Sequence, residues 1–176
     1  NIQQSQKIWK YLDTKYEPID WQIDFKSGFR WSAKTWCYSI AHGHKLGVDI
    51  KTPWEISRCQ HHAWLALGYG AFLANGETKK AEQLVEEFQN QVLDFISTNP
   101  PRYGVNWRCP MDVAIRAANW IIAYEWFIHY GWMPSDEFKN IFANSLFDHG
   151  DFTFKNLEIG KDGFRANHYL ANICGL

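Results

Sequence analysis

The sequence contains no pair of cysteines at a spacing that would hold zinc or form a redox motif. Its four cysteines, Cys37, Cys59, Cys109 and Cys174, lie far apart, and no CxxC occurs. This spacing excludes zinc-ribbon and thioredoxin-type proteins. Three of the cysteines lie in apolar or aromatic stretches, which is typical of small buried hydrophobic residues.

Long apolar runs and net charge are also lacking. No run of about 18 apolar residues occurs, so the sequence predicts no membrane-spanning helix and no membrane partner. The net charge of −1 excludes a bulk field that would attract nucleic acid. A content of 46% hydrophobic and 21% charged residues excludes a disordered or collagen-like chain and indicates a globular one.

Several catalytic and metal motifs are missing as well. Gly68-Tyr69-Gly70 lies inside a predicted helix at the wrong spacing for a phosphate loop, and neither a nucleophile elbow nor HExxH occurs. We expect the adjacent His61 and His62 to point to different faces of a helix. No acid follows them at ligand spacing, so no metal site and no cofactor are predicted.

Aromatic residues, in contrast, are abundant. They make up 17% of the chain, with ten Trp, eight Tyr and twelve Phe, which is more than a core of this size needs. Wide aromatic faces line sugar-binding clefts, although they also fill cores.

Charge is unevenly distributed along the chain. Residues 26–58 carry six basic side chains against two acidic ones, a balance of +4, and residues 77–97 carry five acids against two lysines, a balance of −3. Such an asymmetry suits an anionic ligand on one face, and it is also compatible with an ordinary solvated surface.

Hydrophobic periodicity predicts an all-α chain. Helices are expected at 53–74, 77–97, 110–130, 136 to about 157, and from 167 onward, with 1–16 as a further helix. Thr52 and Ser135 are suitable N-caps. Residues 17–52 are expected to be irregular, and no strand is predicted.

The helix starts recur at a fixed interval. Pro53, Pro110 and Asn167 are each 57 residues apart, and every interval reads as an apolar helix followed by an amphipathic one. This pattern predicts the inner and outer helices of a partial (α/α) toroid or solenoid, with the loops before the inner helices at one end. Six such hairpins take about 340 residues, so we expect residues 1–176 to be the N-terminal portion of the toroid.

The start of the last helix combines a positioned amide with a histidine. Backbone N–H groups at a helix N-terminus favour anions, and the Asn167 amide is a suitable donor to a carboxylate whose charge grows in a transition state. His168, just inside the helix, is expected to act as a neutral base or donor. Alternatively, Asn167 serves only as an N-cap.

Two arginines lie in the first turns of predicted inner helices. Glu55 and Arg58 are spaced as an i,i+3 pair, and Asp112 and Arg116 as an i,i+4 pair. The pairs either hold the helix ends or present both arginines to an acidic sugar. Glu55 and Asp112 could instead be the acid and base of a glycoside hydrolase, but a cationic partner lowers a carboxyl pKa where a general acid needs it raised.

Four stretches give the chain a family likeness over residues 20–176. The first lies in 20–28 and contains DW and FKSG, and the second lies in 48–61 and contains VDIKTPWE and SRCQH. The third lies in 99–116 and contains NPP, GVNW and MDVAIR, and the fourth is NHYLAN at 167–172. In these stretches the chain resembles the N-terminal helical domain of the heparinase II/III-like polysaccharide lyases, which include oligoalginate lyases.

The resemblance implies an incomplete toroid followed by a β-sandwich domain, and β-elimination at a heparan-, heparin- or alginate-like polysaccharide without metal or organic cofactor. It implies that Asn167 neutralises the uronate carboxylate and that His168 assists at the reacting ring. The base tyrosine and a β-sandwich histidine are expected beyond Leu176, so the fragment alone is expected to be inactive. The residues predicted to bind the acidic polysaccharide are Trp54, Arg58, His61, Tyr103, Asn106, Trp107, Arg116 and Tyr169.

Two other functions stay open at this point. One is a non-catalytic α/α glycan-binding or scaffold protein, and the other is an (α/α) glycoside hydrolase. Trp54 and Trp107 fit sugar stacking and core packing equally, whereas Trp120 fits the core. A polymeric substrate implies a periplasmic or extracellular location.

Overall fold

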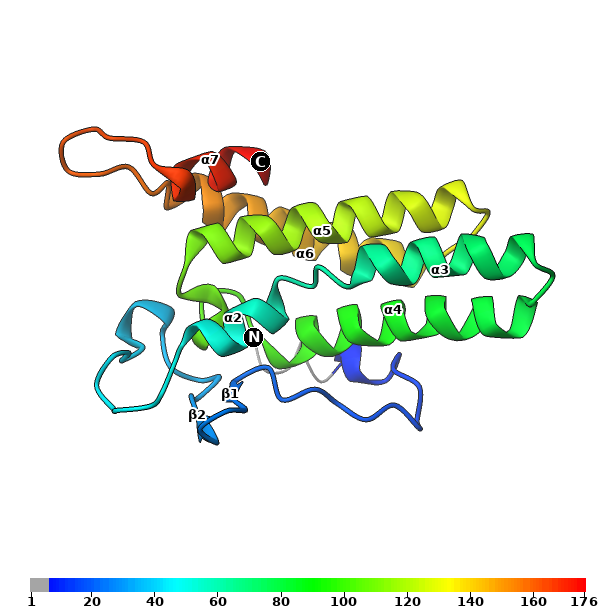
Figure 1. The fold of residues 1–176 in the computed structure, drawn as a ribbon, viewed down its shortest axis with the longest axis horizontal. Coiled ribbons are helices and arrows are strands. Elements are labelled where there is room, and N and C mark those ends of the chain that lie inside the picture. Colours follow the sequence, from blue (N-terminus) through cyan, green and yellow to red (C-terminus); the bar gives the residue numbers. More distant parts are fainter. Residues whose placement is uncertain (1–6) are drawn as a thin grey trace.

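The computed structural model describes residues 7–176 and confirms the all-α class (Figure 1). A small antiparallel hairpin pairs β1 with β2, and residues 37–39 and 105–107 form short 3-10 helices. The strands are β1 (Ile23–Asp24) and β2 (Phe29–Arg30), and the helices are α2 (Lys51–Ser57), α3 (His62–Ala74), α4 (Thr78–Thr98), α5 (Pro110–His129), α6 (Asp136–Lys155) and α7 (Asn167–Cys174).

The long helices form two successive antiparallel hairpins, α3–α4 and α5–α6, and α7 follows them. α3 packs against α4 and α5, and α5 packs against α6 and α7, so the first helices of the hairpins are neighbours. Figure 1 shows α2, α5 and α7 beginning at the same end of the molecule, while the turns 75–77 and 130–135 lie at the other. The predicted gathering of loops at one end is therefore confirmed, and we call this the loop end.

The predicted helix 53–74 is interrupted. α2 ends at Ser57, α3 begins at His62, and Cys59 between them has a φ of +53°. Two backbone carbonyls at the break bond to side chains of α5 instead of to helical N–H groups: the Ser57 carbonyl accepts from Arg116 at 3.4 Å, and the Arg58 carbonyl accepts from Asn119 at 2.8 Å. These partners lie about 60 residues away, so local periodicity could not reveal the break.

One predicted N-cap is confirmed, and the other is wrong. Ser135 caps α6 as predicted, because its Oγ accepts from the Phe138 N–H at 3.2 Å. Thr52 is no cap, since α2 already begins one residue earlier. The prediction of no strand is wrong at β1 and β2. The predicted helix 1–16 falls partly outside the described residues, and of the rest only 7–9 are helical.

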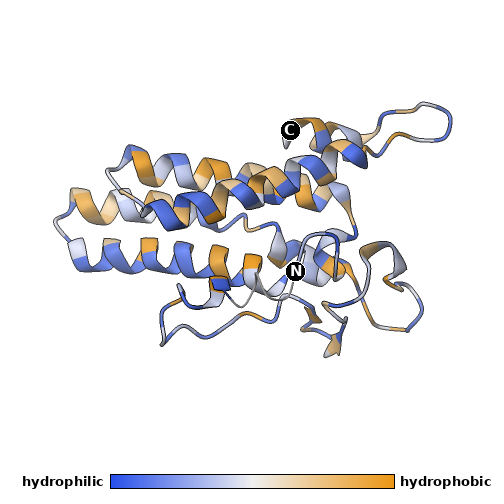
Figure 2. Ribbon diagram, turned by 180° about the vertical axis from the view of Figure 1, so that it is seen from behind, coloured by the Kyte–Doolittle hydropathy of each residue, from blue (hydrophilic) through white to orange (hydrophobic). Residues whose placement is uncertain are grey.

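Aromatic rings dominate the main core, which lies between α3, α4, α5 and α6. Trp120 is fully buried there, as predicted, with its ring edge-on to Phe95 at 5.5 Å. On α4, apolar residues gather on the face turned towards the other long helices, while the opposite face is polar (Figure 2). Cys37, Cys59 and Cys109 are buried as expected, and Cys174 is exposed.

α3 and α5, the predicted inner helices, each expose apolar side chains in the described chain. Trp64 on α3 is 73% exposed, and Ile121 and Ile122 on α5 are exposed as well. None of the described helices has the combination of length and apolar character needed to cross a membrane.

The break between α2 and α3 predicts a stability effect for Asn119→Ala. Losing this donor leaves the Arg58 carbonyl without its partner, so the free energy of unfolding should fall by about 1–2 kcal/mol. Urea denaturation measures it, with Asn140→Ala, an exposed asparagine on α6 without a described hydrogen bond, as the matched control. Equal stability of the two variants would contradict this account of the break.

Candidate functional site

The first turn of α7 lies at the loop end and presents the two residues predicted to act on a substrate. Asn167 is the first residue of α7 and is exposed, and no described residue bonds to its side chain. Ala166 occupies the N-cap position, so the interpretation of Asn167 as an N-cap is wrong. The amide is therefore available at a helix N-terminus, where backbone N–H groups also lack helical partners.

A residue that the sequence did not single out, Glu158, organises this site. One of its carboxylate oxygens accepts from His168 Nδ1 at 2.9 Å. The other accepts from the Met111 backbone N–H at 2.8 Å and from Asn172 Nδ2 at 3.1 Å. Asn172 in turn accepts from the Glu158 backbone N–H at 2.8 Å. A single carboxylate thus joins the N-terminus of α5, where an anion is favoured, to α7.

Glu158 also determines how His168 is presented. Because the carboxylate accepts a hydrogen bond, the hydrogen of the neutral imidazole is assigned to Nδ1, and Nε2 keeps its lone pair. Nε2 bonds to no described residue, and the His168 side chain is 43% exposed. The ring can therefore accept a proton from a ligand, or donate one when it is charged.

The same cluster is the one place in the described chain where three metal-ligating groups meet. The Cys109 thiol, a Glu158 carboxylate oxygen and His168 Nδ1 lie within 4.8 Å of one another. Burial, reinforced by the negative charge of Asp112, strongly raises the pKa of the Cys109 thiol and disfavours the thiolate that zinc requires. A metal would also displace the hydrogen bond between Glu158 and His168. The geometry therefore fits a hydrogen-bonded cluster better than a metal centre.

Arg58 lies at the break between α2 and α3 and is held by two acids. The predicted pair with Glu55 is confirmed. Its second partner is the buried Asp112 on α5, whose Oδ1 accepts from Arg58 Nε at 2.6 Å. The predicted pair between Asp112 and Arg116 is therefore wrong. Arg58 keeps a small exposed surface, but its charge is already balanced by two carboxylates.

Arg116 is fully buried, so the interpretation that it points into a cleft is wrong. Its Nε donates to His149 Nε2 at 2.9 Å, and the other nitrogens donate to the carbonyls of Ser57 and Asn106 at 3.4 and 3.3 Å. The guanidinium lies 4.2 Å from the centre of the Phe95 ring. Burial lowers the pKa of Arg116 to about 10, which still leaves it charged at neutral pH.

Asn106 and Trp107 are buried too and hold the loop before α5. Asn106 Nδ2 donates to the Trp21 carbonyl at 2.7 Å and to Asn99 Oδ1 at 2.9 Å. Trp107 Nε1 donates to the Asn99 carbonyl at 3.1 Å. Both side chains lack the exposed surface that contact with a polymer requires, so their predicted role in binding is replaced by a structural one.

The remaining predicted side chains are at least partly exposed. Trp54 is half-buried, and its Nε1 donates to the Val105 carbonyl at 2.9 Å. Tyr103 is exposed beside Trp36, and Tyr169 is half-buried, with the Arg165 guanidinium 5.4 Å from its ring centre.

His61 and His62 do not point to different faces, contrary to expectation. The exposed His61 Nε2 lies 2.6 Å from Gln91 Oε1, and the buried His62 Nε2 lies 3.0 Å from the same oxygen. His61 precedes α3 instead of lying inside a helix, which lets its ring turn towards that of His62.

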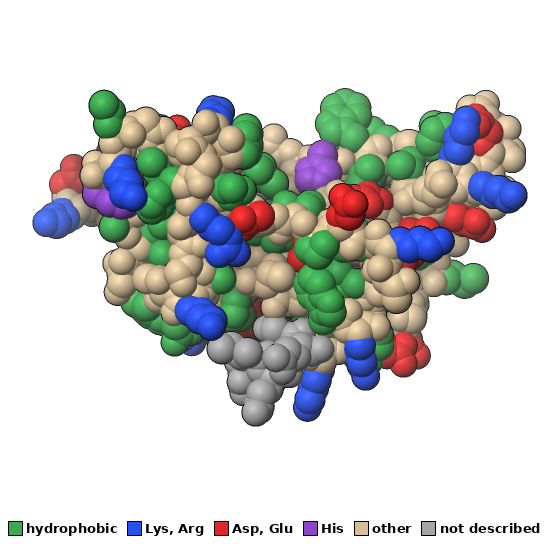
Figure 3. Space-filling model, turned by 90° about the horizontal axis from the view of Figure 1, so that it is seen from below, with side chains coloured by type: hydrophobic (Ala, Val, Ile, Leu, Met, Phe, Trp, Pro, Cys, Tyr) green, Lys and Arg blue, Asp and Glu red, His purple; other side chains and the backbone are tan. Residues whose placement is uncertain are grey.

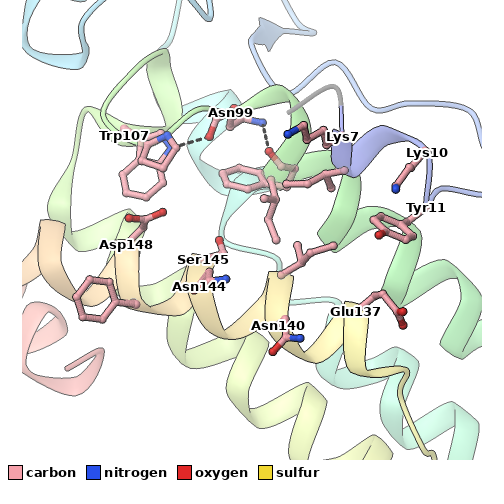
Figure 4. A pocket seen from close by; sticks show the side chains of 16 residues that line it. Lys7, Lys10, Tyr11, Asn99, Trp107, Glu137, Asn140, Asn144, Ser145 and Asp148 are labelled. Carbon is pink, nitrogen blue, oxygen red and sulfur yellow. Dashed lines mark hydrogen bonds between the residues drawn. The ribbon is translucent and has the colours of Figure 1, made fainter. Parts of the chain in front are cut away.

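A pocket of the described chain lies elsewhere. It has a volume of about 860 Å³ and is bounded by the N-terminal segment, α4 and α6 (Figure 4). Trp107 is the only predicted site residue among those that line it. The site at α7 is therefore an open surface and not this pocket.

Charges of both signs are interspersed on the face seen in Figure 3, where lysines and arginines alternate with acidic side chains. The basic and acidic segments of the sequence thus do not separate into two opposed fields on this face. Any attraction of an anionic ligand must arise from individual side chains.

No family model matches the chain, nor does any curated protein or solved structure. The likeness to the heparinase II/III-like lyases therefore rests on the residues quoted for it, and the function has to be argued from the site.

Two buried histidines lead us to predict that the stability of the fold depends on pH. Burial and the neighbouring His61 lower the pKa of His62 to about 3, and burial with the adjacent Arg116 holds that of His149 well below its usual value. The unfolded chain takes up these protons below pH 6.5 and the folded chain does not. The protein therefore has its full free energy of unfolding above pH 6.5. Below that pH, each histidine lowers the free energy of unfolding by up to about 1.4 kcal/mol per pH unit.

Urea denaturation at pH 7.5 and 5.5 measures this loss. The variant His62→Gln should lose less stability between the two pH values than the wild type, whereas the exposed control His129→Gln should match the wild type. An unchanged pH dependence in His62→Gln would show that this histidine takes up its proton in the folded state.

Proposed function

We propose that the chain is the N-terminal part of a polysaccharide lyase of the heparinase II/III-like type, which cleaves a uronic-acid-containing polysaccharide by β-elimination. The hairpins α3–α4 and α5–α6, with α7 beginning a third, would form part of its (α/α) toroid. The order of neighbours α3, α5 and α7 supports this arrangement, because successive first helices pack side by side as in a repeat array.

The observation that carries the proposal is the pairing of an exposed amide with a histidine of fixed orientation on consecutive residues. Asn167 presents its amide at the N-terminus of α7, and His168 presents Nε2 because Glu158 engages Nδ1. Both lie at the loop end, on an open surface that a polymer can reach.

This pair suits the charge changes of β-elimination. Removal of the proton next to a uronate carboxylate moves charge onto that carboxylate, and the bond from the neighbouring ring carbon to the glycosidic oxygen then breaks. An amide donor and the N–H groups of a helix N-terminus stabilise the developing charge. His168 Nε2 is placed to assist at the reacting ring by accepting or donating a proton. The base tyrosine that the resemblance implies would come from outside the present chain, and no cofactor enters the proposed reaction.

The buried position of Asp112 disfavours the glycoside hydrolase alternative. That reaction needs two carboxyl groups flanking a glycosidic bond. Asp112 has no exposed surface and bonds to Arg58. We propose an acidic polysaccharide as the partner, and the periplasm or the outside of the cell as the place where the protein binds it.

Product chemistry tests the proposal in the full-length protein that contains this chain. Incubation with alginate, heparin and heparan sulfate should produce ultraviolet-absorbing unsaturated ends. Reducing ends without this absorbance would identify a hydrolase, and binding without cleavage would identify a glycan-binding protein.

Asn167→Ala should lower kcat by about 10²–10³-fold while the fold is retained, because it removes a donor to the developing charge. Asn140→Ala, an exposed asparagine on α6, is the matched control and should keep full activity. Unchanged turnover in Asn167→Ala would exclude the amide from the mechanism.

The tautomer of His168 provides a readout that does not depend on turnover. ¹⁵N NMR should find Nδ1 protonated and Nε2 unprotonated in the neutral ring. Glu158→Ala should shift the population towards the Nε2–H form, whereas Glu158→Gln, whose amide oxygen can still accept from Nδ1, should retain the wild-type pattern. An unchanged tautomer in Glu158→Ala would contradict the assigned role of the carboxylate.

A further inference from the structure

Three exposed aromatic side chains lie together at the loop end, and one of them, Tyr38, belongs to the short 3-10 helix 37–39. Trp36, Tyr38 and Tyr103 are 41%, 44% and 41% exposed. The Trp36 ring centre is 5.6 Å from that of Tyr103 and 6.3 Å from that of Tyr38, with the ring planes steeply inclined to each other. Such a group presents adjacent aromatic surfaces to solvent.

The backbone holds these rings in place. Trp36 and Tyr103 form an isolated β-bridge, and the Cys37 N–H donates to the Arg102 carbonyl at 2.9 Å. Arg102 has a φ of +71°, which is uncommon for a residue other than glycine. The Tyr38 hydroxyl donates to Asn156 Oδ1 at 2.7 Å. The three rings are therefore ordered before any ligand arrives, which lowers the entropic cost of binding.

A cation without a carboxylate partner lies beside them. The Arg108 guanidinium is 5.4 Å from the centre of the Tyr38 ring, and its side chain forms neither an ion pair nor a hydrogen bond with any described residue. Its Nε is buried without an acceptor. By comparison, Arg30, Arg58 and Arg102 each bond to an acid. The two terminal nitrogens of Arg108 also bond to no described residue and are not fully buried, so they are the donors that an incoming anion can reach.

The rings and the arginine adjoin the site at α7. Arg108 immediately precedes Cys109, whose thiol lies 3.9 Å from the Glu158 carboxylate that holds His168. Asn156, the partner of Tyr38, is two residues before Glu158 in the loop that leads to α7. One polymer could therefore contact both regions.

We infer that Trp36, Tyr38, Tyr103 and Arg108 form a subsite for an anionic sugar residue next to the site at α7. The aromatic faces pack against the apolar face of the sugar ring, and the guanidinium binds its carboxylate or sulfate through paired N–H groups. The inference rests on the proposed function for the polymer class, but it assigns recognition to residues outside the reacting centre.

Binding measurements on the full-length protein test the subsite. Asn167→Ala serves as the background, so that cleavage does not consume the ligand. Calorimetry gives Kd for an oligouronate without sulfate, a sulfated oligosaccharide without uronate, and a neutral oligosaccharide. The first two ligands distinguish a carboxylate from a sulfate as the anion, and the neutral ligand measures stacking alone.

Arg108→Gln should raise Kd for the preferred anionic oligosaccharide by about tenfold or more, because a charge-assisted contact is lost. It should leave the neutral ligand unaffected. Trp36→Ala should raise Kd for both the anionic and the neutral oligosaccharide. The matched controls lie at the opposite end of the molecule: Trp126→Ala removes a similarly exposed tryptophan, and Lys139→Ala removes one positive charge. Both should bind as the background protein does.

Two results would overturn the subsite. In the first, Arg108→Gln and Trp36→Ala bind the oligosaccharides with the same Kd as the control variants. In the second, the background protein binds none of the oligosaccharides. These outcomes are separate from those of the proposed reaction. Unsaturated products together with insensitivity to Arg108→Gln would reject the subsite alone, and sensitive binding without unsaturated products would reject the lyase alone.

Discussion

The buried guanidinium of Arg116 is the interaction on which the arrangement at the loop end depends. It joins α5 to the end of α2 through Ser57, to the loop before α5 through Asn106, and to α6 through His149. No described carboxylate contacts it. The cation is tolerated because His149 stays neutral and offers a lone pair, while Phe95 and Trp107 present their rings to it. α5, α6, the end of α2 and the loop before α5 therefore converge on one charge in the interior.

Glu158 has the complementary role at the surface. It satisfies the N-terminus of α5 and orients two side chains of α7, so the same carboxylate both attaches the helix and fixes the presentation of His168. Structural and functional requirements coincide in this residue. The aromatic group around Trp36 is joined to the same loop, because the Tyr38 hydroxyl donates to Asn156, two residues before Glu158.

The sequence predicted the features that depend on local residue patterns. The α4, α5 and α6 bounds, the Ser135 cap and the start of α7 at Asn167 follow from periodicity and capping residues. The break after Ser57 could not be predicted, because Arg116 and Asn119 compete for its carbonyls from another hairpin. Likewise, the spacing of Asp112 and Arg116 suggested a pair that packing redirected to Arg58. Glu158 was missed because its partners, such as Met111, are close only in space, and an acid in a polar loop carries no distinguishing local signal.

The break between α2 and α3 has a consequence for how the chain folds. Repeat arrays are commonly built from units that each bury their own backbone and then stack. Here the first hairpin leaves two carbonyls that only the second can satisfy, so the first unit is incomplete until α5 has formed against it. The smallest cooperative unit of folding should accordingly be a pair of hairpins. During synthesis, the segment up to Thr98 would wait until the chain has extended through α5, which ends at His129, before it gains its native stability.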